Sequence, residues 1–210
     1  MNIRITSLAV SIGIMSSLNA QVNEKGAVHL AAGIAVGGHA TRYEQSFLGV
    51  VQTTNDGAAT TTLPIEFGYG LGGRFSLGLL LEPGLYLDSV ESESNTLTTF
   101  AIQPRFYLVN GDRFTWMASM QLGSTRLKYD VSEPGNVSSA VYRGAHFGLS
   151  SGVGFYFTDR IGLNVQLRYM ATTMPLRDWS WNGTSLDPDL IDAKLSTSGL
   201  AVQASLAFKF

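Results

Sequence analysis

The sequence predicts an all-β protein, folded as an eight-stranded antiparallel up-and-down transmembrane β-barrel. Three observations lead to this fold class. Apolar residues alternate with small or polar residues along eight stretches of the chain. Short turns rich in Gly and Asn alternate with long polar connections between those stretches. Finally, one face of each stretch carries small and polar residues that suit a narrow lumen, and the other carries large apolar residues. A barrel in water would need its apolar face inside and its polar face outside.

The eight predicted strands cover most of residues 27–210. Each has large apolar residues at every second position, which is the period of a strand with two different faces. Their ranges are 27–44, 61–72, 74–88, 97–109, 113–130, 142–158, 160–174 and 195–210. An even number of strands is the rule for bacterial membrane barrels.

The connections differ in length in a regular way. Three are tight turns, at 72–74, 110–112 and 158–160, and two of these supply the Gly-Gly or Asn-Gly pair that short hairpins favour. Four are long and polar, at 45–60, 89–96, 131–141 and 175–194. Short turns at one end and long loops at the other are typical of transmembrane barrels.

The faces decide which solvent surrounds the barrel. In the stretch 160–174, one face carries Ile161, Leu163, Val165 and Leu167, and the other carries Gly162, Asn164, Gln166 and Arg168. Small and polar residues suit the narrow lumen of eight strands, so the large apolar residues are expected to face lipid. Aromatic residues near both strand ends, including Trp116, Phe155, Tyr86 and Tyr129, suggest two interfacial girdles.

Composition agrees with this assignment. Hydrophobic residues make up 45% of the chain and charged residues only 14%, against about 25% charged in ordinary globular domains. No apolar run beyond residue 20 reaches the roughly 18 residues of a membrane helix. The formal net charge of −2 gives no basic footprint for nucleic acid, and there are no cysteines.

The N-terminus has the layout of a secretory signal peptide. Arg4 precedes a short, mostly apolar stretch that ends at "LNA" before Gln21. We therefore expect residues 1–20 to be a signal peptide and residues 21–210 to be the barrel domain.

The chain ends in "GLAVQASLAFKF", an alternating strand with a terminal phenylalanine. In this ending and in its strand plan the sequence resembles the small eight-stranded bacterial outer-membrane barrels, such as the OmpA membrane domain and OmpX. The resemblance implies a monomer in the outer membrane of a Gram-negative bacterium. It also implies contact with outer-membrane lipids and lipopolysaccharide, and recognition of the strand 199–210 by the barrel assembly machinery.

Four charged residues are expected to face the lumen: Glu66, Glu82, Arg105 and Arg168. Counted from the tight turns, Glu66 and Glu82 fall diagonally across neighbouring strands, and Arg105 falls close to Glu82. Buried charges must be paired. We expect an ion-paired plug, completed by Gln103, Gln121, Gln166 and Gln203, in preference to a gated ion path.

Pro64, Pro83 and Pro104 interrupt predicted strands. Proline removes a hydrogen bond from the ladder and belongs at edges or bulges. Counting from the tight turns places all three at a similar height, towards the long loops. They mark either bulges near strand ends or a lateral seam where a lipid or apolar ligand enters the wall.

No motif predicts a catalytic, cofactor or metal site. The three histidines, His29, His39 and His146, have no partner spacing typical of a hydrolase. Asp187, Asp189 and Asp192 lack the EF-hand pattern. We expect a structural or surface-interaction protein acting through loops 45–60 and 175–194, and no enzyme. The alternatives are a narrow channel or lateral carrier for small apolar molecules, and a lipid-modifying enzyme.

Overall fold

The computed structural model describes residues 21–47, 50–88, 94–133, 136–188 and 192–210. The expected signal peptide, residues 1–20, lies outside this range. The described residues form ten strands: β1 (Val28–Phe47), β2 (Val50–Thr62), β3 (Ile65–Gly72), β4 (Phe75–Asp88), β5 (Ser94–Asn110), β6 (Phe114–Glu133), β7 (Asn136–Tyr156), β8 (Ile161–Trp181), β9 (Thr184–Leu186) and β10 (Asp192–Lys209). In the described part of the chain, no helix is long and apolar enough to cross a membrane.

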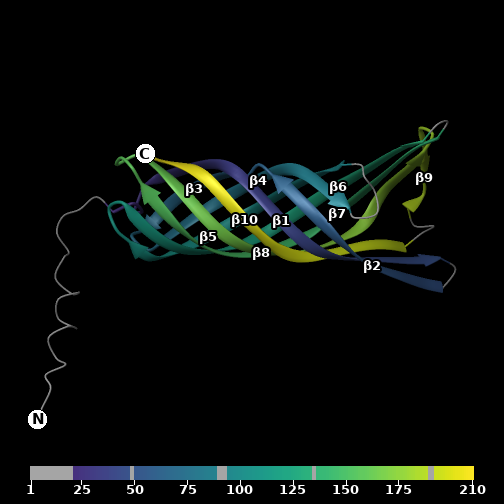
Figure 1. Ribbon diagram of the computed structural model, residues 1–210, viewed down its shortest axis with the longest axis horizontal. Helices are drawn as coiled ribbons and strands as arrows, with labels where there is room; N and C mark the ends of the chain where they lie inside the picture. Colours follow the sequence, from purple (N-terminus) through teal and green to yellow (C-terminus); the bar gives the residue numbers. More distant parts are fainter. Residues whose placement is uncertain (1–20, 48–49, 89–93, 134–135, 189–191) are drawn as a thin grey trace, which may run out of the picture.

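The sheet closes into a barrel (Figure 1). Neighbouring strands pair antiparallel in chain order, and β10 pairs with both β8 and β1. β2 and β3 are two parts of one wall strand that breaks at Leu63–Pro64, since both pair with β1 on one side and β4 on the other. Among the described strands, β9 pairs with β8 alone, outside the wall. The described wall therefore has eight strands, and the predicted fold class is confirmed.

Alternation places small and polar residues inside and large apolar residues outside. Along β8, the residues Gly162, Asn164, Gln166 and Arg168 are buried, and Ile161, Leu163, Val165 and Leu167 between them are exposed. The same alternation on every wall strand produces an outward-facing apolar belt. It includes Val36, Phe67, Leu79, Ile102, Phe106, Trp116, Leu122, Phe147, Leu149, Leu200 and Leu206. Water would make such a surface unfavourable, so hydrocarbon must cover it.

The strands extend well into the ranges that were predicted to be loops. The ranges 45–60, 131–141 and 175–194 were expected to be polar connections, but most of their described residues extend β1, β2, β6, β7 and β8 or form β9. Past the belt, the outward face no longer carries large apolar residues at every second position, because it meets polar surroundings there. Backbone pairing nevertheless continues there, with Thr and Val among the residues that favour strands.

The seam between the first and last strands is long and close. It runs in unbroken register from His29 opposite Lys209 to Ser46 opposite Asp192. A Cβ atom at Gly33 would collide with the Ala204 carbonyl oxygen and Ser205. At Gly199 it would collide with the Gly38 carbonyl oxygen and His39. Glycine at these positions lets the two strands and their luminal side chains approach closely.

Candidate functional site

The middle of the lumen is built around Arg168, whose side chain is 0% exposed. Its Nη1 donates to Glu82 Oε1 at 2.8 Å and its Nη2 donates to Glu82 Oε2 at 2.7 Å. The two parallel bonds form the bidentate arrangement that makes Arg–carboxylate pairs strong and directional. Thr62 also donates to Glu82 Oε1, at 2.5 Å. The pair thus joins β8 to β4 across the barrel.

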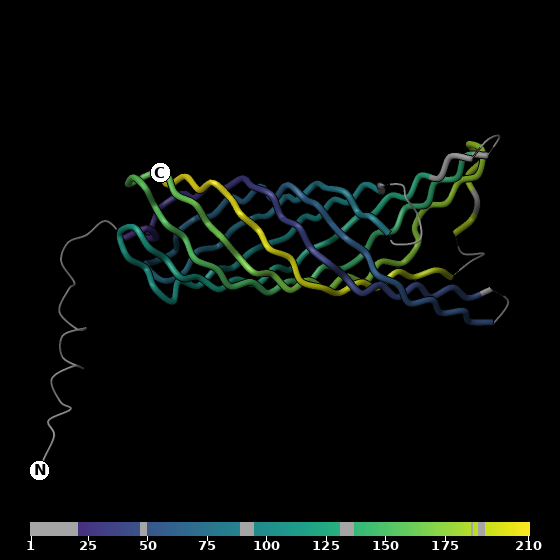
Figure 2. Tube along the Cα trace, in the orientation of Figure 1, coloured from purple at the N-terminus to yellow at the C-terminus, as the bar shows by residue number. Residues whose placement is uncertain are grey.

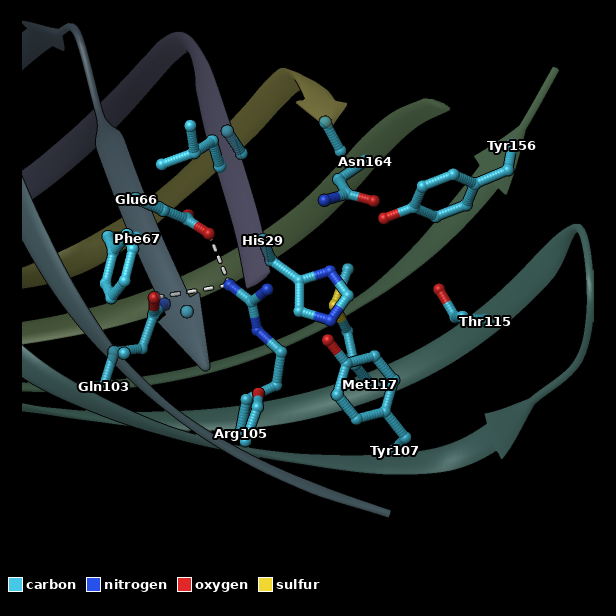
Figure 3. A pocket seen from close by; sticks show the side chains of 16 residues that line it. His29, Glu66, Phe67, Gln103, Arg105, Tyr107, Thr115, Met117, Tyr156 and Asn164 are labelled. Carbon is cyan, nitrogen blue, oxygen red and sulfur yellow. Dashed lines mark hydrogen bonds and ion pairs between the residues drawn. The ribbon is translucent and has the colours of Figure 1, made fainter. Parts of the chain in front are cut away.

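A second ion pair lies towards the tight-turn end, between Arg105 on β5 and Glu66 on β3. Arg105 Nη2 donates to Glu66, and also to Gln103 Oε1 at 3.3 Å (Figure 3). Arg105 and Glu66 are both buried. Each luminal charge in this layer therefore has an opposite charge as its partner.

Gln203 on β10 connects the two ion pairs. Its Oε1 accepts from Arg168 Nη1 at 2.9 Å, and its Nε2 donates to Glu66 Oε1 at 2.7 Å. Gln121 Oε1 accepts from Arg168 Nη2 at 3.1 Å. On the other side, Gln166 Oε1 accepts from Ser150 at 3.1 Å. We call the ion pairs with Gln103, Gln121, Gln166 and Gln203 the polar layer.

All four predicted luminal charges thus lie in the polar layer, but one partner differs from the sequence-based expectation. Arg105 was expected close to Glu82, and it pairs with Glu66 instead. In the ladder, Arg105 lies opposite Ser76 and Glu82 lies opposite Thr99. Counting residues from the tight turns ignores the stagger between tilted strands, and this stagger shifts Arg105 towards the tight-turn end.

Above the polar layer, towards the long-loop end, the lumen is filled by apolar and aromatic side chains. We call this cluster the apolar layer: Tyr86, Leu127, Tyr142, Met174, Ala193 and Leu195, with Tyr43, Leu97, Tyr129 and Leu176 packed against it. Tyr129 packs edge-on against Tyr86 and Tyr142, with ring centroids 6.2 and 5.8 Å away.

The apolar layer was missed in the sequence. Tyr86 and Tyr129 were expected in an interfacial girdle, but Tyr86 is 1% exposed, and its hydroxyl bonds to that of Thr41 at 2.8 Å. The sequence did contain a signal for this layer, because Tyr86 and Tyr129 fall on the inward face of their strands. A luminal face that changes from Gly, Ser and Gln to Tyr, Leu and Met marks this second layer.

The tight-turn end is closed by the segment 21–27, which precedes β1. Asn23 is fully buried and exchanges bonds with Asn110: its N–H donates to Asn110 Oδ1 at 2.9 Å, and Asn110 Nδ2 donates to its carbonyl at 2.6 Å. Its side-chain oxygen bonds to His29 at 3.1 Å. Lys209 on the last strand donates to the Gln21 carbonyl at 2.5 Å.

Two small cavities lie beside these layers in the described part of the lumen. One cavity of about 10 Å³ lies below the polar layer, beside Arg105, His29 and Tyr156 (Figure 3). Another, of about 30 Å³, lies between the polar and apolar layers, beside His39, His146 and Met174. Each has room for about one or two water molecules. Neither of these two cavities provides a continuous aqueous path along the lumen.

The three prolines do not share one height. Pro83 lies opposite Thr98 of β5, and Pro64 lies beside it at the break between β2 and β3. Pro104 lies opposite Leu77, six residues along the same ladder towards the tight-turn end. The stagger that displaced Arg105 also displaces Pro104. Around Pro64 the wall stays paired: the Gly33 N–H donates to its carbonyl at 3.1 Å, and the Leu63 N–H donates to that of Pro83 at 2.8 Å.

The histidines are all held by neutral partners. His29 bonds to Asn23, His39 to Thr60 at 2.8 Å, and His146 to Gln121 at 3.3 Å. Among the described residues, none of the three bonds to a serine or a carboxylate. Asp187 follows β9, Asp192 begins β10, and Asp189 lies outside the described residues. Within the described ranges, no three His, Asp or Glu side chains are grouped so as to hold a metal ion.

Comparison with known proteins gives the fold a clear context. No protein-family model matches the sequence, and no curated protein matches it in sequence. The outer-membrane protein OprG of Pseudomonas aeruginosa is similar in structure, with a TM-score of 0.59 and 13% identity over 90% of this chain and 97% of that one. AlkL, an outer-membrane protein solved in DMPC bilayers, has a TM-score of 0.55 and 11% identity, over 90% and 92% of the two chains.

At these sequence identities the comparison shows the fold alone. This fold agrees with the apolar belt on the outer surface. The resemblance to the small outer-membrane barrels is confirmed at the level of structure. The apolar belt requires a membrane, and closed barrels of this kind are how strands cross one. The chain is therefore an integral β-barrel protein of the outer membrane of a Gram-negative bacterium.

Proposed function

We propose that the protein is a non-conducting outer-membrane barrel with a structural and surface-interaction role. The observation that carries this proposal is the filling of the lumen. The segment 21–27, the polar layer and the apolar layer follow one another along the barrel axis, and the spaces between them hold about one or two waters each. An ion would have to break the bidentate Arg168–Glu82 pair to pass.

The long-loop end supports the interaction role. Two groups of strands continue past the belt, β1 with β2 and β6 with β7 and β8, and they diverge at the end of the barrel (Figure 2). Their outward side chains are mainly polar and exposed, as at Thr53, Asn55, Arg143 and Asp178. The contact surface we propose is therefore strand surface beyond the membrane. It includes parts of the ranges 45–60 and 175–194 that were expected to be loops.

Single-channel recording in planar bilayers tests the closed lumen. We expect no conductance steps from the refolded protein, because the polar layer and the apolar layer fill its described lumen. The double variant Arg168→Ala/Glu82→Ala removes the central pair without leaving a single unpaired charge, and we expect it to admit ions. A matched double variant on the outer wall, Leu122→Ala/Leu149→Ala, should stay silent. Regular conductance steps from the unaltered protein would overturn the proposal.

A second candidate, lateral transport of small apolar molecules, is favoured by one observation. A shallow groove of about 600 Å³ lies on the lipid-facing wall at Pro104, lined by Phe75, Phe106, Met120 and Leu149. Beside it, the pairing of β5 with β6 is interrupted between Ile102 and Arg105. Liposomes containing the protein would then take up a small apolar fluorophore faster than protein-free liposomes. Replacing Met120 with Trp would fill the groove and abolish the difference. Equal uptake by both kinds of liposome would remove this candidate.

A further inference from the structure

Three arginines gather on the outer wall just beyond the apolar belt: Arg126 on β6, Arg143 on β7 and Arg177 on β8. We call them the arginine triad. All three side chains are exposed. Arg126 and Arg143 lie directly opposite each other in the ladder. Like charges in that position repel and destabilise a sheet, so the arrangement needs a compensating anion.

A β-bulge brings the third arginine to the same face. On β7, Tyr142 pairs with Leu176 and Val141 pairs with Asp178, which leaves Arg177 as an extra residue on β8. The bulge turns both Arg177 and Asp178 outward. Arg177 is then a diagonal neighbour of Arg143, within reach of a ligand that bridges them.

The triad borders a hollow in the wall. The hollow has a volume of about 660 Å³ and is lined by all three arginines, together with Ser124, Val141, Gly144 and Asp178. Small residues beneath the arginines leave this space open. The hollow contains three positive charges against the single negative charge of Asp178.

None of the three arginines forms an ion pair with any residue that the structure describes. The nearby Lys128 differs, since it is held by Asp130 at 2.7 Å. On the far side of the barrel, Arg42 is held by Glu44 at 2.6 Å. Lys128 and Arg42 thus have carboxylate partners, whereas the triad, like the exposed Arg74, Arg113 and Arg160 at the tight-turn end, has none among the described residues.

The height of the triad identifies the environment it meets. Leu122 is the last large apolar residue of the belt on β6, and Phe147 is the first on β7. Arg126 and Arg143 each lie four residues beyond them, which is about 10 Å along the membrane normal for tilted strands. This is the level of lipid headgroups on the long-loop side.

We propose that the arginine triad binds the phosphate groups of an outer-leaflet glycolipid, such as the lipid A part of lipopolysaccharide. Planar guanidinium groups bind phosphate oxygens through paired hydrogen bonds. A doubly phosphorylated headgroup would fill the hollow and neutralise the opposed pair, while its acyl chains would lie along the belt below. The site is independent of the closed lumen, so a conducting barrel would leave it unaffected.

Native mass spectrometry of the folded protein in detergent, which measures the binding of lipid A, tests the proposal. We expect the triple variant Arg126→Gln/Arg143→Gln/Arg177→Gln to bind doubly phosphorylated lipid A at least about tenfold more weakly. Dephosphorylated lipid A should bind the unaltered protein just as weakly. The matched control, Arg74→Gln/Arg113→Gln/Arg160→Gln, removes three exposed arginines at the tight-turn end and should bind like the unaltered protein.

Urea unfolding gives an independent readout. Because the opposed arginines repel each other, the triple variant should unfold at the same or higher urea concentration than the unaltered protein in lipid-free detergent. Added lipid A should raise the midpoint of the unaltered protein and leave that of the variant unchanged. Should the triple variant fail to fold, the single variant Arg143→Gln replaces it in both measurements.

Three results would overturn the proposal. The first is equal binding of lipid A by the triple variant and the unaltered protein. The second is equal binding of phosphorylated and dephosphorylated lipid A by the unaltered protein. The third is saturable binding of inorganic phosphate alone with the same arginine dependence, which would assign the site to a free anion.

Discussion

The two layers that fill the lumen solve one packing problem in opposite ways. The polar layer joins six strands through charged and amide groups, each of which needs a partner at a fixed distance. The apolar layer fills the same bore with rings and aliphatic side chains that need only contact. The difference teaches that the polar layer specifies which strands face each other, whereas the apolar layer contributes mainly burial.

The largest expected effect comes from breaking the central pair. Arg168→Met removes the guanidinium and leaves Glu82 buried without its opposite charge, which should lower the free energy of unfolding by about 3–5 kcal/mol. Urea titration of the refolded barrel in micelles measures this change. Adding Glu82→Gln to the same chain should recover part of the loss. A single variant as stable as the original would show that the ion pair contributes nothing.

An intermediate effect is expected in the apolar layer. Leu127 is 0% exposed, and Leu127→Ala should lower the free energy of unfolding by about 2–5 kcal/mol, through lost burial and the cavity left behind. Leu122→Ala on the same strand is the matched control. Leu122 is 48% exposed on the belt, so lipid or detergent can fill the space and the loss should be smaller. Equal losses at both positions would mean that the luminal contacts are not tightly packed.

The smallest expected effect concerns a single hydrogen bond to the polar layer. Thr62→Val keeps the shape of the side chain but removes the donor to Glu82 Oε1. Because Arg168 still holds that carboxylate, the loss should be about 1 kcal/mol in the same urea titration. A loss as large as that of Arg168→Met would show that Thr62, and not the ion pair, determines the position of Glu82.

The wall of the barrel could be predicted from the sequence because a membrane imposes a strict period of two. Residues such as Leu163 and Asn164 differ so sharply in polarity that their faces are unambiguous. The same period identified Glu66, Glu82, Arg105 and Arg168 as luminal. Beyond the belt that constraint disappears, and β2 and the outer parts of β6, β7 and β8 therefore read as loops.

What a single sequence does not contain is the stagger between strands. Arg105 and Pro104 lie nearer the tight-turn end than counting from the turns suggests, because each tilted strand is shifted against its neighbour. The bulge at Arg177 could not be predicted from the sequence either, because an extra residue on β8 is recognised only when its pairing with β7 is known. Strand faces follow from residue type, whereas partners across the barrel follow from the geometry of closure.

The close β1–β10 seam has a consequence for how the barrel is completed. Pairing the two outermost strands is the last possible step of ring formation, since every other strand already has both neighbours by then. A displacement by one residue would move Gly33 from its place opposite Ser205 and turn the luminal Gln203 towards lipid. Ring closure therefore depends on the alignment of all preceding strands, because a register error in any of them would displace β10 against β1.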